Sequence, residues 1–151
     1  MTEISRILVH FDASPRSLAR LRVARSLAGG FDAQVTAMYA VDPLHQLSVF
    51  GQWEPMASNL PKLQQRDAEH LASARRQFER ERGDGPSPLQ WAELGATPLA
   101  GAFADQALFA DLVVLGQHDA RDAETSNVPA DLIATTVIGS GRPALVVPYA
   151  G

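Results

Sequence analysis

Short apolar segments alternate with longer helix-like segments along the whole chain, and this alternation constrains the fold more than any other feature of the sequence. The clearest apolar segment is 111–116, Asp-Leu-Val-Val-Leu-Gly, which is nearly continuous in apolar residues. A run of this kind is typical of a strand in a parallel sheet whose two faces are covered by helices. Strict alternation therefore predicts an α/β domain built around one doubly wound parallel sheet.

Five strands and four helices are expected, in the order βαβαβαβαβ. We predict strands at residues 4–11, 33–41, 89–94, 111–116 and 144–147. Helices are expected after Pro15 and Pro98, where a first-turn proline needs no amide donor, and over residues 60–82 and 132–138. We expect the sheet order 3-2-1-4-5, with helices on both faces, in a Rossmann-like fold. With 151 residues and no break in composition, the chain fits a single domain spanning residues 1–151.

The composition argues against several classes of function. The chain has no cysteine, which removes disulfides, thiol catalysis and thiolate metal sites. Its formal net charge of -4 gives no reason to expect nucleic acid as a partner. No basic and apolar leader opens the sequence, and no apolar run approaches the roughly 20 residues of a membrane helix. We therefore expect a cytoplasmic protein without a membrane partner.

The predicted carboxyl ends of the strands hold the candidate ligand-binding residues, because doubly wound sheets bind their ligands there. These ends carry the short segments 12–14, 41–43 and 116–119. Asp12 could receive a ribose hydroxyl or a base edge. It could equally be a turn residue that helps Ser14 to cap the first helix. The sequence leaves both interpretations open.

Two histidines lie near the same strand ends. His10 and His118, together with Asp12 and Asp119, could bind a metal through nitrogen and oxygen atoms. No ligand-spacing motif supports a metal, and polar residues at strand ends are usually solvated, so we expect no metal. No serine lies in a G-x-S-x-G turn, and we expect no catalytic residues.

Two further segments have competing interpretations. Residues 139–141, Gly-Ser-Gly, look like a phosphate loop, but they follow a helix and precede a strand. We therefore expect a helix C-cap and a turn there. The long connection over residues 44–61 carries Phe50, Trp53 and Met56. These side chains could line a ligand cleft or a partner surface, but we expect them to cover the end of the core.

Four segments match a known family in order and spacing. The first strand ends in Phe-Asp-Ala-Ser at 11–14, and the second ends in Met-Tyr-Ala-Val at 38–41. The last third reads Ala-Asp-Leu-Val-Val-Leu-Gly at 110–116 and Gly-Arg-Pro-Ala-Leu-Val-Val-Pro at 141–148. Together they resemble the universal stress protein family over nearly the whole chain. The resemblance implies the adenine nucleotide alpha hydrolase-like form of the fold and a homodimer formed through the last strand.

One motif divides that family. Its ATP-binding members carry G-x2-G-x9-G-[ST] after the fourth strand, where glycines let backbone amides approach phosphates closely. Gly116 supplies the first glycine, but the other three positions hold Asp119, Pro129 and Ala130. The acids around the site, opposed only by Arg121, would repel a polyanion; they are Asp119, Asp122, Glu124 and Asp131. The chain therefore resembles the branch that does not bind ATP.

We expect a non-catalytic, homodimeric stress-response protein without a cofactor, which acts through contacts with itself and with other proteins. The expected dimer interface is the apolar edge strand and the proline after it, namely Ala144, Leu145, Val146, Val147 and Pro148. The alternative is a protein that binds ATP, another adenine nucleotide or a small ligand through Asp12, Val41 and Gly116, with weak nucleotide hydrolysis. A flavin-binding electron-transfer domain is a third and less favoured hypothesis.

Overall fold

The computed structural model describes residues 3–44 and 59–149. Within these residues, five parallel strands form one sheet in the order β3-β2-β1-β4-β5, which confirms the predicted fold class and strand order. The strands are β1 (Arg6–Phe11), β2 (Gln34–Ala40), β3 (Leu89–Leu94), β4 (Leu112–Gly116) and β5 (Ala144–Val147). The interpretation of Phe50, Trp53 and Met56 falls outside the described residues.

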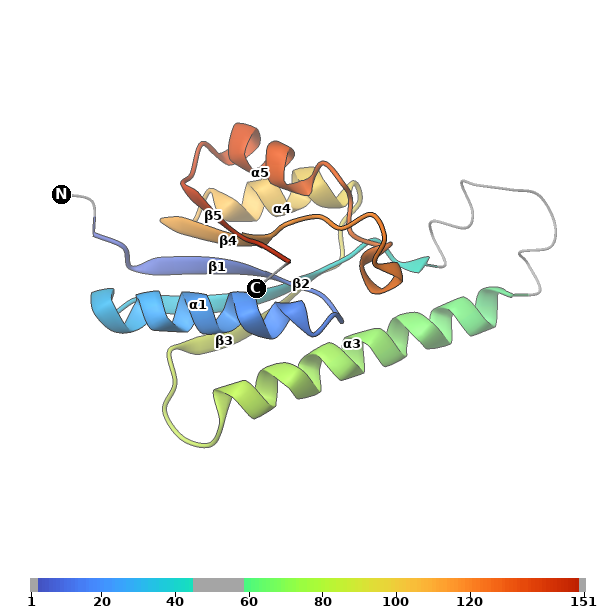
Figure 1. Ribbon diagram of the computed structural model, residues 1–151, viewed down its shortest axis with the longest axis horizontal. Helices are drawn as coiled ribbons and strands as arrows, with labels where there is room; N and C mark the ends of the chain where they lie inside the picture. The colour runs from blue at the N-terminus through green and yellow to red at the C-terminus, as the bar shows by residue number, and fades with distance from the viewer. Residues whose placement is uncertain (1–2, 45–58, 150–151) are drawn as a thin grey trace.

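Helices cover both faces of the sheet (Figure 1). One face carries α1 (Arg16–Phe31) and α3 (Leu60–Arg82), and the other carries α4 (Leu99–Ala107) and α5 (Leu132–Ser140). The loop between β4 and α5 contains one short 3₁₀ turn, η1 (Ala123–Thr125). Helix α5 ends at Gly141, whose φ of 63° is left-handed and whose amide donates to the Val137 carbonyl. The predicted C-cap at residues 139–141 is confirmed.

Two apolar layers, one on each face of the sheet, form the core. Side chains alternate between the faces along a strand, so Ile7, Val9 and Phe11 of β1 pack toward α1 and α3. Leu8 packs on the opposite face, in the layer with α4 and α5. His10 lies on that second face too, where its ring meets the Phe103 ring edge-on at 5.5 Å. A buried imidazole therefore stands at the carboxyl end of the central strand.

The start of α1 differs from its prediction. The helix begins at Arg16, and no side chain caps it with a hydrogen bond. The Ser14 hydroxyl is buried and has no hydrogen-bond partner within residues 3–44 and 59–149. The interpretation of Ser14 as a helix cap is therefore wrong. Its amide instead donates to Asp12 Oδ1 at 2.8 Å, so the turn is organised by the aspartate.

Candidate ligand site at the carboxyl ends of the strands

The winding of the sheet reverses between β1 and β4, because β2 and β3 extend it to one side and β4 and β5 to the other. These two central strands pair directly, with Val9 opposite Val114. Their carboxyl ends therefore bring residues 10–12 beside residues 115–118. A ligand of a doubly wound sheet is expected in the crevice at this point.

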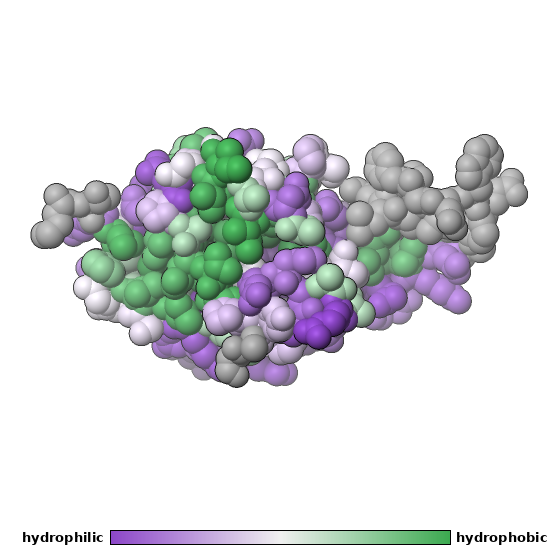
Figure 2. Space-filling model, turned by 45° about the horizontal axis from the view of Figure 1, so that its top comes forward, coloured by the Kyte–Doolittle hydropathy of each residue, from purple (hydrophilic) through white to green (hydrophobic). Residues whose placement is uncertain are grey.

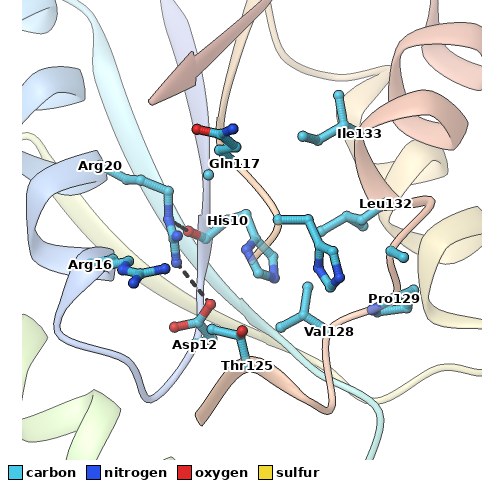
Figure 3. Close-up of a pocket in the computed structure, with 13 residues that line it drawn as sticks. His10, Asp12, Arg16, Arg20, Gln117, Thr125, Val128, Pro129, Leu132 and Ile133 are labelled. Carbon is cyan, nitrogen blue, oxygen red and sulfur yellow. Dashed lines mark hydrogen bonds and ion pairs between the residues drawn. The ribbon is translucent and has the colours of Figure 1, made fainter. Parts of the chain in front are cut away.

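A buried arginine from α1 occupies this crevice (Figure 3). Arg20 Nε donates to the His10 carbonyl at 2.8 Å, and Arg20 Nη2 donates to Asp12 Oδ2 at 3.0 Å and to Ser17 Oγ at 2.7 Å. The guanidinium thus joins helix α1 to the end of β1. Only 4% of the surface of Arg20 is exposed, so water takes little part in these contacts.

Both carboxylate oxygens of Asp12 accept hydrogen bonds, from its own turn and from the start of α1. Oδ1 accepts from the Ser14 amide at 2.8 Å and from the Ser17 hydroxyl at 2.9 Å, and Oδ2 accepts from Arg20. The Asp12 amide donates to Ser17 Oγ at 2.9 Å. Of the two interpretations of Asp12, the described contacts match the turn residue rather than a free acceptor for a ligand hydroxyl.

Burial and the Arg20 guanidinium set the pKa values of Asp12 and His10 in the crevice. Burial alone would raise the pKa of Asp12, but the Arg20 guanidinium, with His10 and the Ser14 hydrogen bonds, lowers it below its usual range. Burial and then Arg20 lower the pKa of His10 from 6.5 to about 4. His10 is therefore neutral at physiological pH, and its Nε2 lies 2.7 Å from the Ala40 carbonyl, to which it donates.

Gly116 is the remaining glycine of the family motif, and packing against Arg20 leaves no room for a side chain there. A Cβ built on Gly116 would overlap Nη1 of Arg20 and would approach Cδ and Cζ of the same side chain at 3.2 Å. Arg20 cannot move aside easily, because three hydrogen bonds fix its guanidinium. The space that a phosphate-binding glycine leaves open is filled here by an arginine side chain.

The acidic loop after β4 is neutralised more fully than the sequence suggested. Arg16, in the first turn of α1, lies 3.6 Å from a carboxylate oxygen of Asp119 and 3.6 Å from one of Asp122. Arg121 adds a contact to Asp119 at 3.3 Å, and its amide lowers the pKa of Asp119 by donating to Oδ1. The expectation that only Arg121 opposes these acids is therefore wrong. Asp119 and Asp122 therefore pair with Arg16, a cation that could otherwise bind an anionic ligand.

The end of β2 is tied to the same loop. The Asp42 amide donates to the Asn127 carbonyl at 2.8 Å, and Asn127 is buried. Val41 is half-buried, and its side chain packs against the core layer beneath α1 and α3. Burial and the nearby Asp131 carboxylate raise the pKa of Asp42, so negative charge is crowded at this side of the crevice.

The space left between these groups is small. A pocket bounded by β1, β4, α1 and the start of α5 has a free volume of about 30 Å³, close to the share of one water molecule in the liquid. In Figure 3, Arg20 and Arg16 lie on one side of it, and Val128, Pro129, Leu132 and Ile133 lie on the other. Cavities that bury drug-sized ligands are roughly tenfold larger.

A wider hollow of about 380 Å³ lies on the other side of Gly116, between the start of α1 and the end of β5. Arg16, Arg20, Gln117 and Tyr149 are among the residues that line it. The Arg16 guanidinium lies 5.2 Å from the centre of the Tyr149 ring, a cation–π contact. Arg16 therefore links the acidic loop to the segment that follows β5.

The metal site considered for His10, His118, Asp12 and Asp119 is not assembled. Among residues 3–44 and 59–149, no three His, Cys, Asp or Glu side chains gather closely enough to hold a metal ion. His118 lines the small pocket with His10, but Asp12 and Asp119 are each engaged with arginines. Nor does any helix in the described part of the chain have the length and apolarity to cross a membrane.

The predicted interface residues lie together at one edge of the sheet. Strand β5 pairs with β4 on one side only. Leu145 and Val146 are 38% and 40% exposed, and Ala144 and Val147 are half-buried. Pro148 follows them at the surface.

Sequence reasoning missed Arg20 and Arg16. A signal for Arg20 was present, because it lies in the inward-facing stripe of α1 with Ser17, Leu21 and Ala24. A charge in the buried stripe of a helix requires a partner, and Asp12 at the end of the preceding strand was the natural candidate. Nothing in the sequence placed Arg16 beside a loop one hundred residues away.

The chain is similar to known proteins in both sequence and structure. A sequence model described as the universal stress protein family matches residues 3–140. The universal stress protein UspA from Lactobacillus plantarum has a similar structure, with a TM-score of 0.68 and 22% identity over 97% of this chain and 99% of that one. A universal stress protein solved in complex with cAMP gives a TM-score of 0.56 and 18% identity, over 97% of this chain and 98% of that one.

A further family member, from Burkholderia pseudomallei, gives a TM-score of 0.54 and 19% identity over 98% of both chains. No curated protein matches the chain significantly in sequence. The family match covers most of the chain, and the similar structures align with 97–98% of it. The chain belongs to the universal stress protein family.

Proposed function

We propose that this chain is a non-catalytic, homodimeric universal stress protein that does not bind ATP tightly. One observation carries the proposal: the Arg20 side chain fills the crevice where the sheet winding reverses and holds Asp12 in an ion pair at 3.0 Å. A phosphate placed against Gly116 would have to displace Arg20 from that buried pair, and leaving a buried charge without its partner costs about 3–5 kcal/mol.

The residues of the ATP motif do not fit a triphosphate. Gly116 lies against Arg20, so its open side is not available for close approach. Pro129 has no amide to donate, and Ala130 has no hydroxyl. Asp119 and Asp122 already hold Arg16, which is the cation best placed for an anionic group. Of the remnant set Asp12, Val41 and Gly116, Asp12 is held by Arg20 and Gly116 lies against the same side chain.

Dimerisation through β5 is favoured by a comparison of the two sheet edges. At the β3 edge, Glu93 is exposed and Arg75 lies 3.8 Å from its carboxylate, and charged groups of this kind protect an edge from pairing. At the β5 edge, the exposed side chains are Leu145 and Val146. An apolar strand with unpaired backbone groups is a template for pairing with a second copy.

The test of ligand binding is calorimetric titration of the purified protein with MgATP, after absorbance has shown that no nucleotide co-purified. Because a similar protein was solved with cAMP, cAMP is titrated in parallel. We expect no heat of binding for either ligand at millimolar concentration. Binding with a micromolar Kd that is weakened by Asp12→Asn would contradict the proposal. Asp84→Asn, which neutralises a surface acid elsewhere, is the matched control.

A further inference from the structure

The basic residues of the chain are gathered on two helices that cover one face of the sheet. Helices α1 and α3 hold ten of the 13 Lys and Arg residues but only four of the 17 Asp and Glu residues. Arg16 and Arg20 belong to the crevice, and the other eight lie elsewhere on these helices. Both helices lie on the same face (Figure 1), and Arg22 and Arg25 of α1 reach Glu81 of α3. The net charge of -4 therefore averages a basic face with an acidic remainder.

The side of α3 that faces α1 carries a basic stripe. Two contacts identify this side, because Glu81 accepts from Arg22 Nε at 3.1 Å and Gln77 donates to the Ala13 carbonyl, just before α1, at 3.2 Å. With 100° of rotation per residue, four exposed basic residues project within about 100° of Gln77, and together they form the basic stripe: Lys62, Arg66, Arg76 and Arg80. The stripe runs for about 27 Å along the helix.

The cations of the basic stripe are not neutralised by the described part of the chain. Within residues 3–44 and 59–149, none of the four makes an ion pair. One acid, Glu69, interrupts the stripe, and its carboxylate accepts from Gln65 at 3.0 Å. On the side toward β3, by contrast, Arg75 pairs with Glu79 at 3.1 Å and with Glu93 at 3.8 Å. An excess of positive charge is therefore left along the side of α3 beside α1.

This face offers charge but no apolar anchor. Among the described residues, the exposed large apolar side chains include none from α3, and Phe31, the last residue of α1, is the one that α1 supplies. Figure 2, which brings the α5 side forward, shows a broad apolar area there and hydrophilic residues along the lower margin, toward α3. Protein interfaces are held by buried aromatic or apolar anchors, and a helix that lies on a membrane needs an apolar side. Both kinds of partner are disfavoured here.

A phosphate backbone needs no apolar anchor, because its binding comes from cations that pair with phosphates and release counterions. Three of the four residues of the basic stripe are arginines, and a guanidinium can donate two parallel hydrogen bonds to one phosphate. Arg76 and Arg80 lie about 6 Å apart along the helix axis. The whole stripe is as long as about eight base steps of duplex DNA at 3.4 Å each.

We propose that the α1–α3 face binds the phosphate backbone of nucleic acid without regard to its sequence, through the basic stripe together with Arg22 and Arg25. This inference goes beyond the proposed function and does not depend on dimerisation. The net charge of the chain gave no reason to expect such a partner, because it sums this face with the acidic remainder. Phosphate contacts position a nucleic acid but do not read its bases.

The experiment is a fluorescence anisotropy titration of a fluorescein-labelled DNA duplex of about 20 base pairs with the full chain, at several salt concentrations. The double variant Arg76→Gln with Arg80→Gln removes two cations of the basic stripe. Arg75→Gln with Arg82→Gln is the matched control, because it removes the same charge from the same helix, and Arg82 points about 160° away from Arg80. Glutamine and arginine have similar helix propensities, so both variants are expected to fold, and thermal melts check this.

We expect wild-type Kd in the range of about 10⁻⁶–10⁻⁴ M, and a salt dependence of log K that weakens by about 0.9 for each phosphate contact removed. The stripe variant should therefore lose about 2 from the slope, and its Kd should rise at least about tenfold at low salt. The control should change Kd less than about threefold.

Three results would overturn the proposal. No rise in anisotropy at about 100 μM protein and low salt would exclude phosphate-backbone binding. An equal loss in the two double variants would overturn the assignment to the side of α3 beside α1. A poly-glutamate peptide that binds more tightly than the duplex would show that the face serves an acidic protein instead.

Discussion

Replacement of Arg20 by methionine tests whether the buried ion pair organises the strand ends. Methionine keeps much of the length and apolar volume of the arginine stem but removes the cation and three hydrogen-bond donors. Asp12 is 2% exposed and would be left as a buried carboxylate without its partner. Breaking a buried pair by removing one member costs about 3–5 kcal/mol. A domain of this size has about 5–15 kcal/mol of stability in total, so the loss is large.

The measurement is urea-induced unfolding at pH 7, followed by circular dichroism. Arg25→Met is the matched control, because Arg25 lies on the same helix but is 49% exposed and pairs with Glu81 at 3.5 Å. An exposed pair of this kind contributes about 0–1 kcal/mol. We expect Arg20→Met to lower the free energy of unfolding by at least about 2 kcal/mol more than Arg25→Met does.

A second variant separates the ion pair from general packing. In Asp12→Asn with Arg20→Met, no buried charge remains, so the double variant should be more stable than the sum of the two single losses predicts. A coupling free energy of about 1–3 kcal/mol is expected for two residues in direct contact. Equal stability of Arg20→Met and Arg25→Met, or simple additivity in the double variant, would refute the reasoning.

Two further predictions concern the same crevice. His10 keeps its neutral form down to a pKa of about 4 in the folded chain, whereas the unfolded chain takes up the proton near 6.5. Unfolding therefore binds a proton between these values, and the free energy of unfolding should fall by about 3 kcal/mol as the pH drops from 6.5 to 4. Urea unfolding across this range should show a shallower fall in His10→Gln, and an unchanged pH dependence would contradict the assignment. Gly116→Ala should cost about 1–3 kcal/mol, because the methyl group overlaps Arg20. That cost should shrink in the Arg20→Met background, and an equal cost in both would show that the overlap does not decide it.

The amino-acid sequence alone predicted the fold and the position of the crevice at the carboxyl ends of the strands. The alternation of short apolar runs with helical segments predicted five parallel strands, and the bounds of β3 and β5 were predicted to the residue. This was possible because strand and helix periodicities are local, and because parallel strands require helical crossovers. The sequence also showed that Asp119 and Pro129 replace two glycines of the ATP-binding motif, because a motif is defined by residue spacing along the chain.

The tertiary structure decided how the site is filled. Arg20 reaches Asp12 and Gly116 only because α1 packs across the paired ends of β1 and β4, and Arg16 meets Asp119 only because the loop after β4 folds back over α1. Spacing along the chain carries no information on contacts between residues about one hundred positions apart. For the same reason, the sequence marked Gly116 as a remnant of a phosphate loop, whereas packing against an arginine accounts for it. Local periodicity determined the order of strands and helices. Long-range packing and charge pairing determined which side chains fill the crevice at the carboxyl ends of the strands.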